Sequence, residues 1–190
     1  MKLLSSLLLM IAALLSTGCV EVAHKVDKVL TFRTWENYES DVSYADFNPA
    51  RHQRVSFSQN MFPVWIADNN SWLKFNINFG SCYAGLNEIK IDDFANDIAP
   101  FKAFLAWSGQ PFAERESTLS TLNARDDFKN NKYYAINEAV THEPLFVFSR
   151  DVDLFHPERH MALTRKDITH VILMAITVKV EHDQAAKAQK

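Results

Sequence analysis

The strongest constraint on the fold is a strict alternation of residue types between Leu73 and Phe79. Every second residue of this stretch is apolar, and the residues between them are Lys74, Asn76 and Asn78. Successive side chains of a strand point to opposite faces, whereas a helix would scatter the apolar set around its circumference. The sequence therefore predicts a strand with its apolar side in a core and Lys74, Asn76 and Asn78 in water.

Turn residues and further apolar runs surround this strand. The cluster Asp-Asn-Asn-Ser at 68–71 separates it from the apolar run Phe62–Ile66, and this arrangement predicts a β-hairpin. Additional strands are predicted where β-branched and aromatic residues gather, at 29–35, 132–139 and 145–148.

The segment 168–180 is apolar on all sides. Its many β-branched residues, including Val171, Ile172 and Ile176, favour a strand over a helix. A strand that is apolar on both sides is typical of the buried centre of a sheet. We therefore expect 168–180 to be a central strand.

Residues 88–107 fit two descriptions. A helix opening at Asp92 would place Phe94, Ile98, Phe101 and Leu105 on one side, but Pro100 inside it would cost about 3 kcal/mol. The favoured alternative is a turn followed by a strand over 101–107, where apolar residues alternate.

The order of these segments predicts the fold class. About eight short strands separated by turn clusters favour a β-rich chain, in the form of an antiparallel β-sandwich with one or two short helices in its connections. We find no linker or repeat, so one domain is expected over 29–181, followed by a disordered tail at 182–190.

The N-terminus has the features of a secretory signal. Lys2 precedes an apolar run, Leu3–Leu15, which is shorter than the roughly 20 residues of a membrane-spanning helix. The run ends in small residues, and Gly18 stands directly before Cys19.

This ending resembles the lipobox of bacterial lipoproteins. The resemblance implies that residues 1–18 are a cleaved signal peptide, that Cys19 carries the lipid, and that 19–28 form a tether to the membrane. Val20, in place of Asp, implies sorting to the outer membrane, with the body facing the periplasm of the cell envelope. Two or three acyl chains would anchor such a protein stably.

Composition and cysteine count exclude several function classes. A net charge of −3 gives no general attraction to nucleic acid, so no nucleic-acid partner is expected. The 47% of apolar residues argues against a disordered chain. Beyond Cys19, the only cysteine is Cys82, which we expect to be a buried small side chain rather than half of a disulfide.

Few residues point to catalysis. His156 and His160 are four apart with Asp151 and Asp153 nearby, a set that could hold Zn²⁺, but the metalloprotease motif HExxH is absent. The glycine cluster at 80–85 lacks the spacing of a nucleophile elbow. We therefore predict no catalytic residue and no cofactor, and His156 and His160 remain weak metal candidates.

Two tryptophans are the candidate contacts for a partner. Trp72 is out of phase with the apolar set that starts at Leu73, so it should point away from the core, and Trp65 is a second candidate. The predicted function is a lipid-anchored, non-enzymatic module that binds a protein partner through sheet edges and exposed aromatics. It would serve as an accessory subunit of an envelope or secretion assembly, or as an immunity-type inhibitor of an envelope-targeting toxin. The alternative is an envelope hydrolase or metal-binding enzyme that uses His156 and His160.

Overall fold

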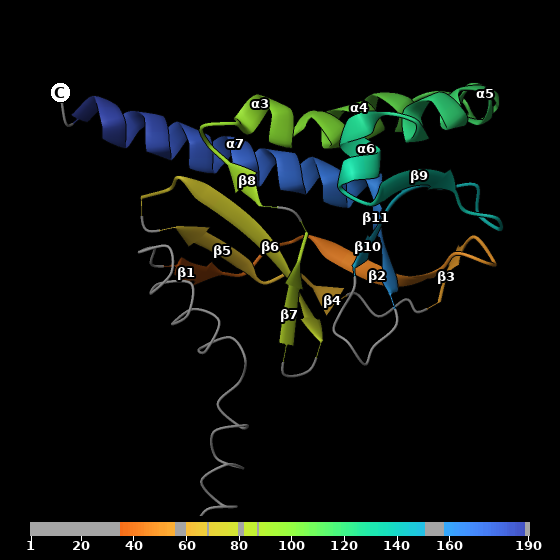
Figure 1. The fold of residues 1–190 in the computed structure, drawn as a ribbon, viewed down its shortest axis with the longest axis horizontal. Helices are drawn as coiled ribbons and strands as arrows, with labels where there is room; N and C mark the ends of the chain where they lie inside the picture. The colour runs from red at the N-terminus through yellow and green to blue at the C-terminus, as the bar shows by residue number, and fades with distance from the viewer. Residues whose placement is uncertain are drawn as a thin grey trace, which may run out of the picture.

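Two antiparallel sheets lie beneath a layer of helices in the described part of the chain (Figure 1). The structure is a computed structural model. It describes residues 35–55, 60–67, 69–79, 82–86, 88–150 and 158–188. The expectations for the signal peptide, Cys19, the tether, His156 and most of the strand at 29–35 lie outside these residues.

The first sheet contains the predicted hairpin. Its strands run in the order β1-β5-β6-β7, and β8 also pairs with β6. In the hairpin, Val64 pairs with Phe75 and Ile66 with Leu73, and all four side chains are buried. The alternation therefore identified this element correctly. The bounds are β1 Trp35–Tyr38, β5 Val64–Ala67, β6 Trp72–Phe79, β7 Cys82–Gly85 and β8 Ile89–Lys90.

The second sheet runs in the order β3-β2-β11-β10-β9, with β4 beside β2. Its bounds are β2 Ser43–Asn48, β3 Gln53–Arg54, β4 Asn60–Met61, β9 Tyr133–Asn137, β10 Pro144–Arg150 and β11 Arg159–Thr164. The strands predicted at 132–139 and 145–148 match β9 and β10.

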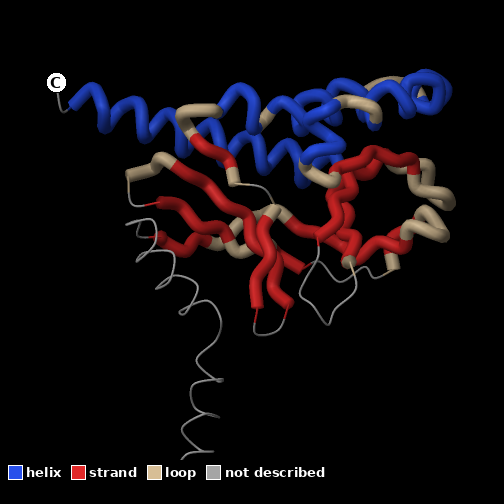
Figure 2. Tube along the Cα trace, in the orientation of Figure 1, coloured by secondary structure: helices blue, strands red, loops and turns tan. Residues whose placement is uncertain are grey.

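This second sheet curls until its two ends meet, as the ring of strands in Figure 2 shows. The backbone N–H of Ala139, just after β9, donates to the carbonyl of His52 beside β3 at 2.9 Å. The N–H of Arg54 donates to the Glu138 carboxylate, also at 2.9 Å. The inner side of the curl has its own small core, which is formed by Phe47, Ile136, Leu145, Val147 and Ala162.

A side chain hydrogen-bonds the outer edge of β9 where a further strand would otherwise pair. The Asn123 amide accepts a hydrogen bond from the Ala135 N–H at 2.7 Å and donates one to the Ala135 carbonyl at 3.0 Å. Asn123 is the last residue of the helix that lies along this strand. It therefore fills the place that a neighbouring strand would take.

Five described helices form the layer above the sheets. They are α3 Phe94–Asp97, α4 Ala99–Ser108, α5 Phe112–Asn123, α6 Asp126–Asn130 and α7 Arg165–Ala188. The main core lies between helices and strands, where Phe101, Phe104 and Phe128 surround Phe146 of β10. The β-rich, antiparallel part of the prediction is confirmed, whereas the sandwich is not confirmed, because a whole layer of helices replaces the one or two short connecting helices expected.

The segment 168–180 is helix α7 and not a central strand. The Thr164 hydroxyl and the Asp167 carboxylate form a capping box: Asp167 accepts hydrogen bonds from the Thr164 N–H and hydroxyl, and its own N–H donates to the Thr164 hydroxyl. Burial recurs every three or four residues, as in a helix, so packing overrides the preference of β-branched residues for strands. The helix continues to Ala188, so residues 182–188, expected to be disordered, are helical. The buried apolar set is Ile168, Val171, Ile172, Ala175 and Val178.

The segment 101–107 is also helical, in α4. Pro100 lies in the first turn of α4, where its missing N–H has no partner to lose, so the penalty that favoured a strand does not apply. Phe101, Phe104 and Trp107 are buried beneath this helix. The helical alternative was therefore the better description, with a break at Ile98 between α3 and α4.

Candidate protein-interaction site

A short loop between β9 and β10 is tightly held by its own hydrogen bonds. We call residues 138–143 the clamped loop. The N–H of Glu138 donates to the Glu143 carbonyl at 2.8 Å, and that of His142 donates to the Glu138 carbonyl at 2.9 Å. The Thr141 hydroxyl donates to the Glu138 carboxylate at 2.5 Å and accepts from the Glu143 N–H at 3.2 Å. The loop therefore has one well-defined shape.

Arg54 of β3 holds both ends of the clamped loop. Its Nε and Nη2 atoms donate to the Glu138 carboxylate at 3.0 and 2.7 Å, and Nη2 also donates to Glu143 at 2.6 Å. The side chains of Arg54 and Glu138 are 14% and 6% exposed. These hydrogen bonds from Arg54 lower the pKa of Glu138 to about 2, so the carboxylate is ionised at neutral pH.

A second arginine fixes the loop from the helix layer. Arg115 of α5 donates from Nη2 to the His142 carbonyl at 2.8 Å and from Nε to the Asn137 side-chain oxygen at 2.7 Å. Its guanidinium carbon lies 5.8 Å from the ring centroids of both Trp107 and Phe112. A guanidinium over an aromatic ring is attracted by the negative face of the ring. Arg115 therefore links α4, α5 and the clamped loop.

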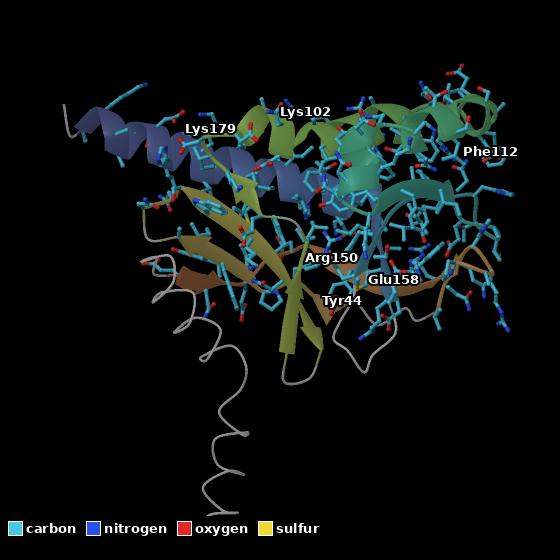
Figure 3. The ribbon with its side chains drawn as sticks, viewed as in Figure 1. Tyr44, Lys102, Phe112, Arg150, Glu158 and Lys179 are labelled. Atoms are coloured by element: carbon cyan, nitrogen blue, oxygen red, sulfur yellow. The ribbon has the colours of Figure 1, made fainter. Side chains whose placement is uncertain are left out.

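Three apolar side chains project from this rigid end of the molecule, and we call them the tip. They are Val140 at the apex of the clamped loop, Val55 after β3 and Phe112 at the start of α5, with exposed fractions of 74%, 62% and 43%. Figure 3 labels Phe112 at this end, where its ring lies 4.7 Å from that of His142. Val140 lies on the clamped loop, Phe112 begins α5 and Val55 follows β3 directly, so the chain presents exposed apolar side chains from three separate segments at this end.

The backbone at the tip is strained. His52 and His142 have φ angles of 51° and 57°, in the left-handed region that non-glycine residues rarely adopt. The His52 carbonyl accepts a hydrogen bond from the Ala139 N–H, and the His142 carbonyl accepts one from Arg115 of α5. Strain of this kind persists only where surrounding contacts enforce it, and it is common at binding sites.

A second set of exposed apolar residues lies on α7, on the side away from the core. We call Leu173, Ile176 and Val180 the α7 row, and their exposed fractions are 56%, 42% and 47%. Their spacing of three and four residues places them on one side of the helix.

The structure brings Trp65 and Trp72 together on one side of the first sheet. The β5–β6 register places Trp65 opposite Lys74, on the side away from the main core, and Trp72 packs with Trp65 there. Trp72 therefore points away from the main core, as its phase predicted. However, Trp65 is only 6% exposed, and the Lys90 amine lies 4.8 Å from the Trp72 ring centroid.

Asn76 does not face water. It lies on the same side of β6 as Trp72 and Lys74 but is 1% exposed, and neither its amide oxygen nor its amide nitrogen has a hydrogen-bond partner among the described residues. The expectation failed because this side of the sheet is itself largely buried, as the burial of Trp65 and Ala67 shows.

Of the two weak metal candidates, only His160 lies among the described residues. His160 lies on β11 with its Nδ1 atom 3.4 Å from the Tyr134 hydroxyl, and burial raises the pKa of Tyr134 to about 12. Within the described ranges, no three His, Cys, Asp or Glu side chains are grouped so that they could hold a metal ion. Cys82 lies in β7.

The tip could not be identified from the sequence. Arg54 and Glu138 are 84 positions apart, so no local pattern shows that they meet. One sequence feature did point to it. Val140 is the only large apolar residue between Glu138 and Glu143, and a single apolar residue among polar ones does not form the buried side of a helix or strand.

No described helix is both long enough and apolar enough to cross a membrane. No protein-family model matches this chain, and no curated protein or solved structure matches it either.

Proposed function

We propose that this chain is a lipid-anchored protein of the cell envelope that binds a protein partner and catalyses no reaction. The anchor is Cys19, and the expected location is the outer membrane, facing the periplasm. The similarity of residues 1–19 to a lipoprotein signal supports the anchor. The observation that carries the binding function is Val140 at the tip, because an exposed apolar side chain on a firmly held loop loses little freedom when a partner covers it.

Metabolic labelling with palmitate tests the anchor. We expect the full chain to be labelled and Cys19→Ala to lose the label, because the acyl groups are attached through that residue. Cys82→Ala is the matched control and should be labelled like the wild type. Equal labelling of Cys19→Ala and the wild type would remove the anchor from the proposal.

Affinity capture from detergent-solubilised envelopes tests the binding function. A charge at the tip should block the partner, since an apolar contact cannot desolvate a carboxylate cheaply. Val140→Asp should therefore lose the captured protein, whereas Leu173→Asp, at another exposed aliphatic side chain in the α7 row, should keep it. Retention of the partner by Val140→Asp would show that the tip is not the contact.

Two biological roles fit this function: an accessory subunit of an envelope or secretion assembly, and an immunity-type inhibitor of an envelope-targeting toxin. A deletion strain separates them. An immunity protein's loss exposes cells to killing by neighbouring cells, whereas an accessory subunit's loss lowers the amount of assembled complex in a pure culture.

A further inference from the structure

We infer that the outer edge of β1 binds an extended segment of a partner protein that carries Lys or Arg at alternate positions and adds to the first sheet as a further strand. This edge belongs to a different sheet from the tip. The inference therefore goes beyond the proposed function and does not depend on the contact at Val140.

Strand β1 forms a border of the first sheet as the described strands define it (Figure 1). Along an antiparallel ladder, pairs that exchange hydrogen bonds alternate with pairs that do not. The Asn76 N–H of β6 donates to the Pro63 carbonyl at 2.8 Å, so the bonded pairs of this ladder include Pro63. The alternation then makes Val64 and Ile66 of β5 turn their peptide groups away from β6 and towards β1.

The register shows which peptide groups of β1 remain unused. Glu36 pairs with Ile66 and Tyr38 with Val64, so the peptide groups of Glu36 and Tyr38 bond β5. Asn37 lies between them and turns its N–H and C=O outward, where no described residue bonds them. The outer edge of β9, by contrast, is already bonded by a side chain of α5. The edge of β1 can therefore accept an added strand.

The charged groups beside this edge are acidic. The Tyr38 hydroxyl donates to the Glu36 carboxylate at 2.6 Å, on the side of the sheet that faces the helices. This hydrogen bond raises the pKa of Tyr38, and the charges of Glu36 and of Glu181 in α7 raise it further, so a second carboxylate lies close by. Glu39 and Asp41 follow β1 directly. All four acidic residues are exposed, and none of them forms an ion pair with a described Lys, Arg or His.

These carboxylates determine the chemistry of the strand that can bind. A second copy of β1 would bring Glu36 and Glu39 of both copies together, and like charges on neighbouring strands destabilise the pairing. In a strand with Lys or Arg at alternate positions, all the cations point to one side of the sheet. On the helix side they lie beside Glu36, Glu181 and the ring of Tyr38, all of which attract a cation. The occupant is therefore a basic extended segment and not a second copy of this chain.

A synthetic peptide tests the chemistry of the occupant. The purified full chain is titrated with the labelled peptide Thr-Lys-Val-Lys-Val-Lys-Thr, and binding is followed by fluorescence anisotropy. In one control peptide Glu replaces every Lys. In the other the central backbone nitrogens are methylated, which keeps the charge but removes the hydrogen-bond donors that an added strand needs. We expect both control peptides to bind at least about tenfold more weakly than the lysine peptide.

Substitutions in the chain test the place of binding. Asn37→Pro removes the outward N–H, whereas the bonds from Glu36 and Tyr38 to β5 remain, so it should weaken binding of the lysine peptide at least about tenfold. Asn37→Thr keeps the N–H and is the matched control, which should bind like the wild type. The double variant Glu36→Lys, Glu181→Lys should reverse the preference and bind the glutamate peptide more tightly than the lysine peptide.

Amide hydrogen exchange measured by NMR shows where the peptide binds even if Asn37→Pro does not fold. In the free wild type, the outward N–H of Asn37 should exchange quickly. Saturating lysine peptide should slow this exchange at least about tenfold, because the N–H then bonds the added strand. The N–H of Glu36, which bonds β5, should be protected with and without peptide.

Several results would overturn the inference. Equal binding of the lysine and methylated peptides would mean that charge alone attracts the peptide and that no strand is added. Equal binding of the lysine and glutamate peptides would remove the acidic recognition. Absence of binding, or an unchanged exchange rate at Asn37, would remove the edge as a binding site. A dimer of the full chain that Asn37→Pro abolishes would assign the edge to a second copy.

The tip is tested separately from this edge. Val140→Asp should bind the lysine peptide like the wild type, because the tip and β1 belong to different sheets. Loss of peptide binding by Val140→Asp would contradict the assignment to β1. Failure of the peptide experiments leaves the proposed contact at the tip in place, and failure of the envelope capture leaves the strand edge in place.

Discussion

The Glu138 carboxylate allows a quantitative test of how the clamped loop is held. Glu138→Gln keeps the shape of the side chain and one oxygen that accepts hydrogen bonds, but it removes the charge that faces Arg54. A glutamate carboxyl group ordinarily has a pKa of 4.5, and in the folded protein the hydrogen bonds from Arg54 lower the pKa of Glu138 to about 2. A shift of this size corresponds to about 3 kcal/mol of folding free energy at neutral pH. We therefore expect Glu138→Gln to lower the free energy of unfolding by about 2–3 kcal/mol at pH 7.

The pH dependence has a definite sign. Because the folded-state pKa is lowered, the carboxylate stabilises the folded protein fully above about pH 4.5 and loses this effect as the pH falls through about 2. The difference in unfolding free energy between wild type and Glu138→Gln should therefore shrink by about 2 kcal/mol between pH 7 and pH 3.

Urea unfolding of the purified full chain, followed by circular dichroism at pH 7, 4 and 3, measures both quantities. Asp127→Asn is the control. Its partner Arg125 is 44% exposed, so this ion pair should contribute less than about 1 kcal/mol. The reasoning fails if Glu138→Gln is as stable as the wild type at pH 7, or if the difference between them is the same at pH 7 and pH 3.

Three further substitutions test other parts of the fold by the same unfolding assay. Asp167→Ala removes the cap of α7 and the bonds that Asp167 accepts from the Ser43 N–H and hydroxyl, and should cost about 2 kcal/mol; an unchanged stability would mean that α7 needs no cap. Phe146→Ala leaves a cavity where four aromatic rings meet the Phe146 ring and should cost about 3–5 kcal/mol; a loss below about 1 kcal/mol would contradict the described core. Asn76→Val replaces a buried amide that has no hydrogen-bond partner among the described residues, and should leave stability unchanged or raise it by about 1 kcal/mol; a clear loss would show that the amide has a partner in solution.

The elements predicted correctly are those whose signal is local. The β5–β6 hairpin follows from alternation and a turn cluster, both of which lie within 18 consecutive residues. Helix α7 was missed because its β-branched residues were given more weight than the three- and four-residue spacing of the buried set. The capping box Thr164-x-x-Asp167 was a local signal that would have corrected this.

The tip depends on contacts that no window of sequence contains. The curl of the second sheet brings β3 against the end of β9, and only then do Arg54 and Glu138 meet. Similarly, Arg115 reaches the clamped loop because α5 packs along β9. The exposure of Val140 depends on this geometry, whereas the phase of Trp72 relative to Leu73 is visible in the sequence, so the sequence pointed to Trp72 and Trp65 and not to the tip.

The hydrogen bonds of the Asn123 amide have a consequence for the tendency of this protein to aggregate. An unpaired strand edge invites a strand from another molecule, which is a common route to aggregates. While α5 stays docked, another strand cannot pair with β9 at Ala135, because the Asn123 side chain already bonds the N–H and the carbonyl of that residue. Another molecule can pair with β9 at this position only after α5 has detached. The rate of deuterium uptake at the Ala135 amide would report how often α5 detaches.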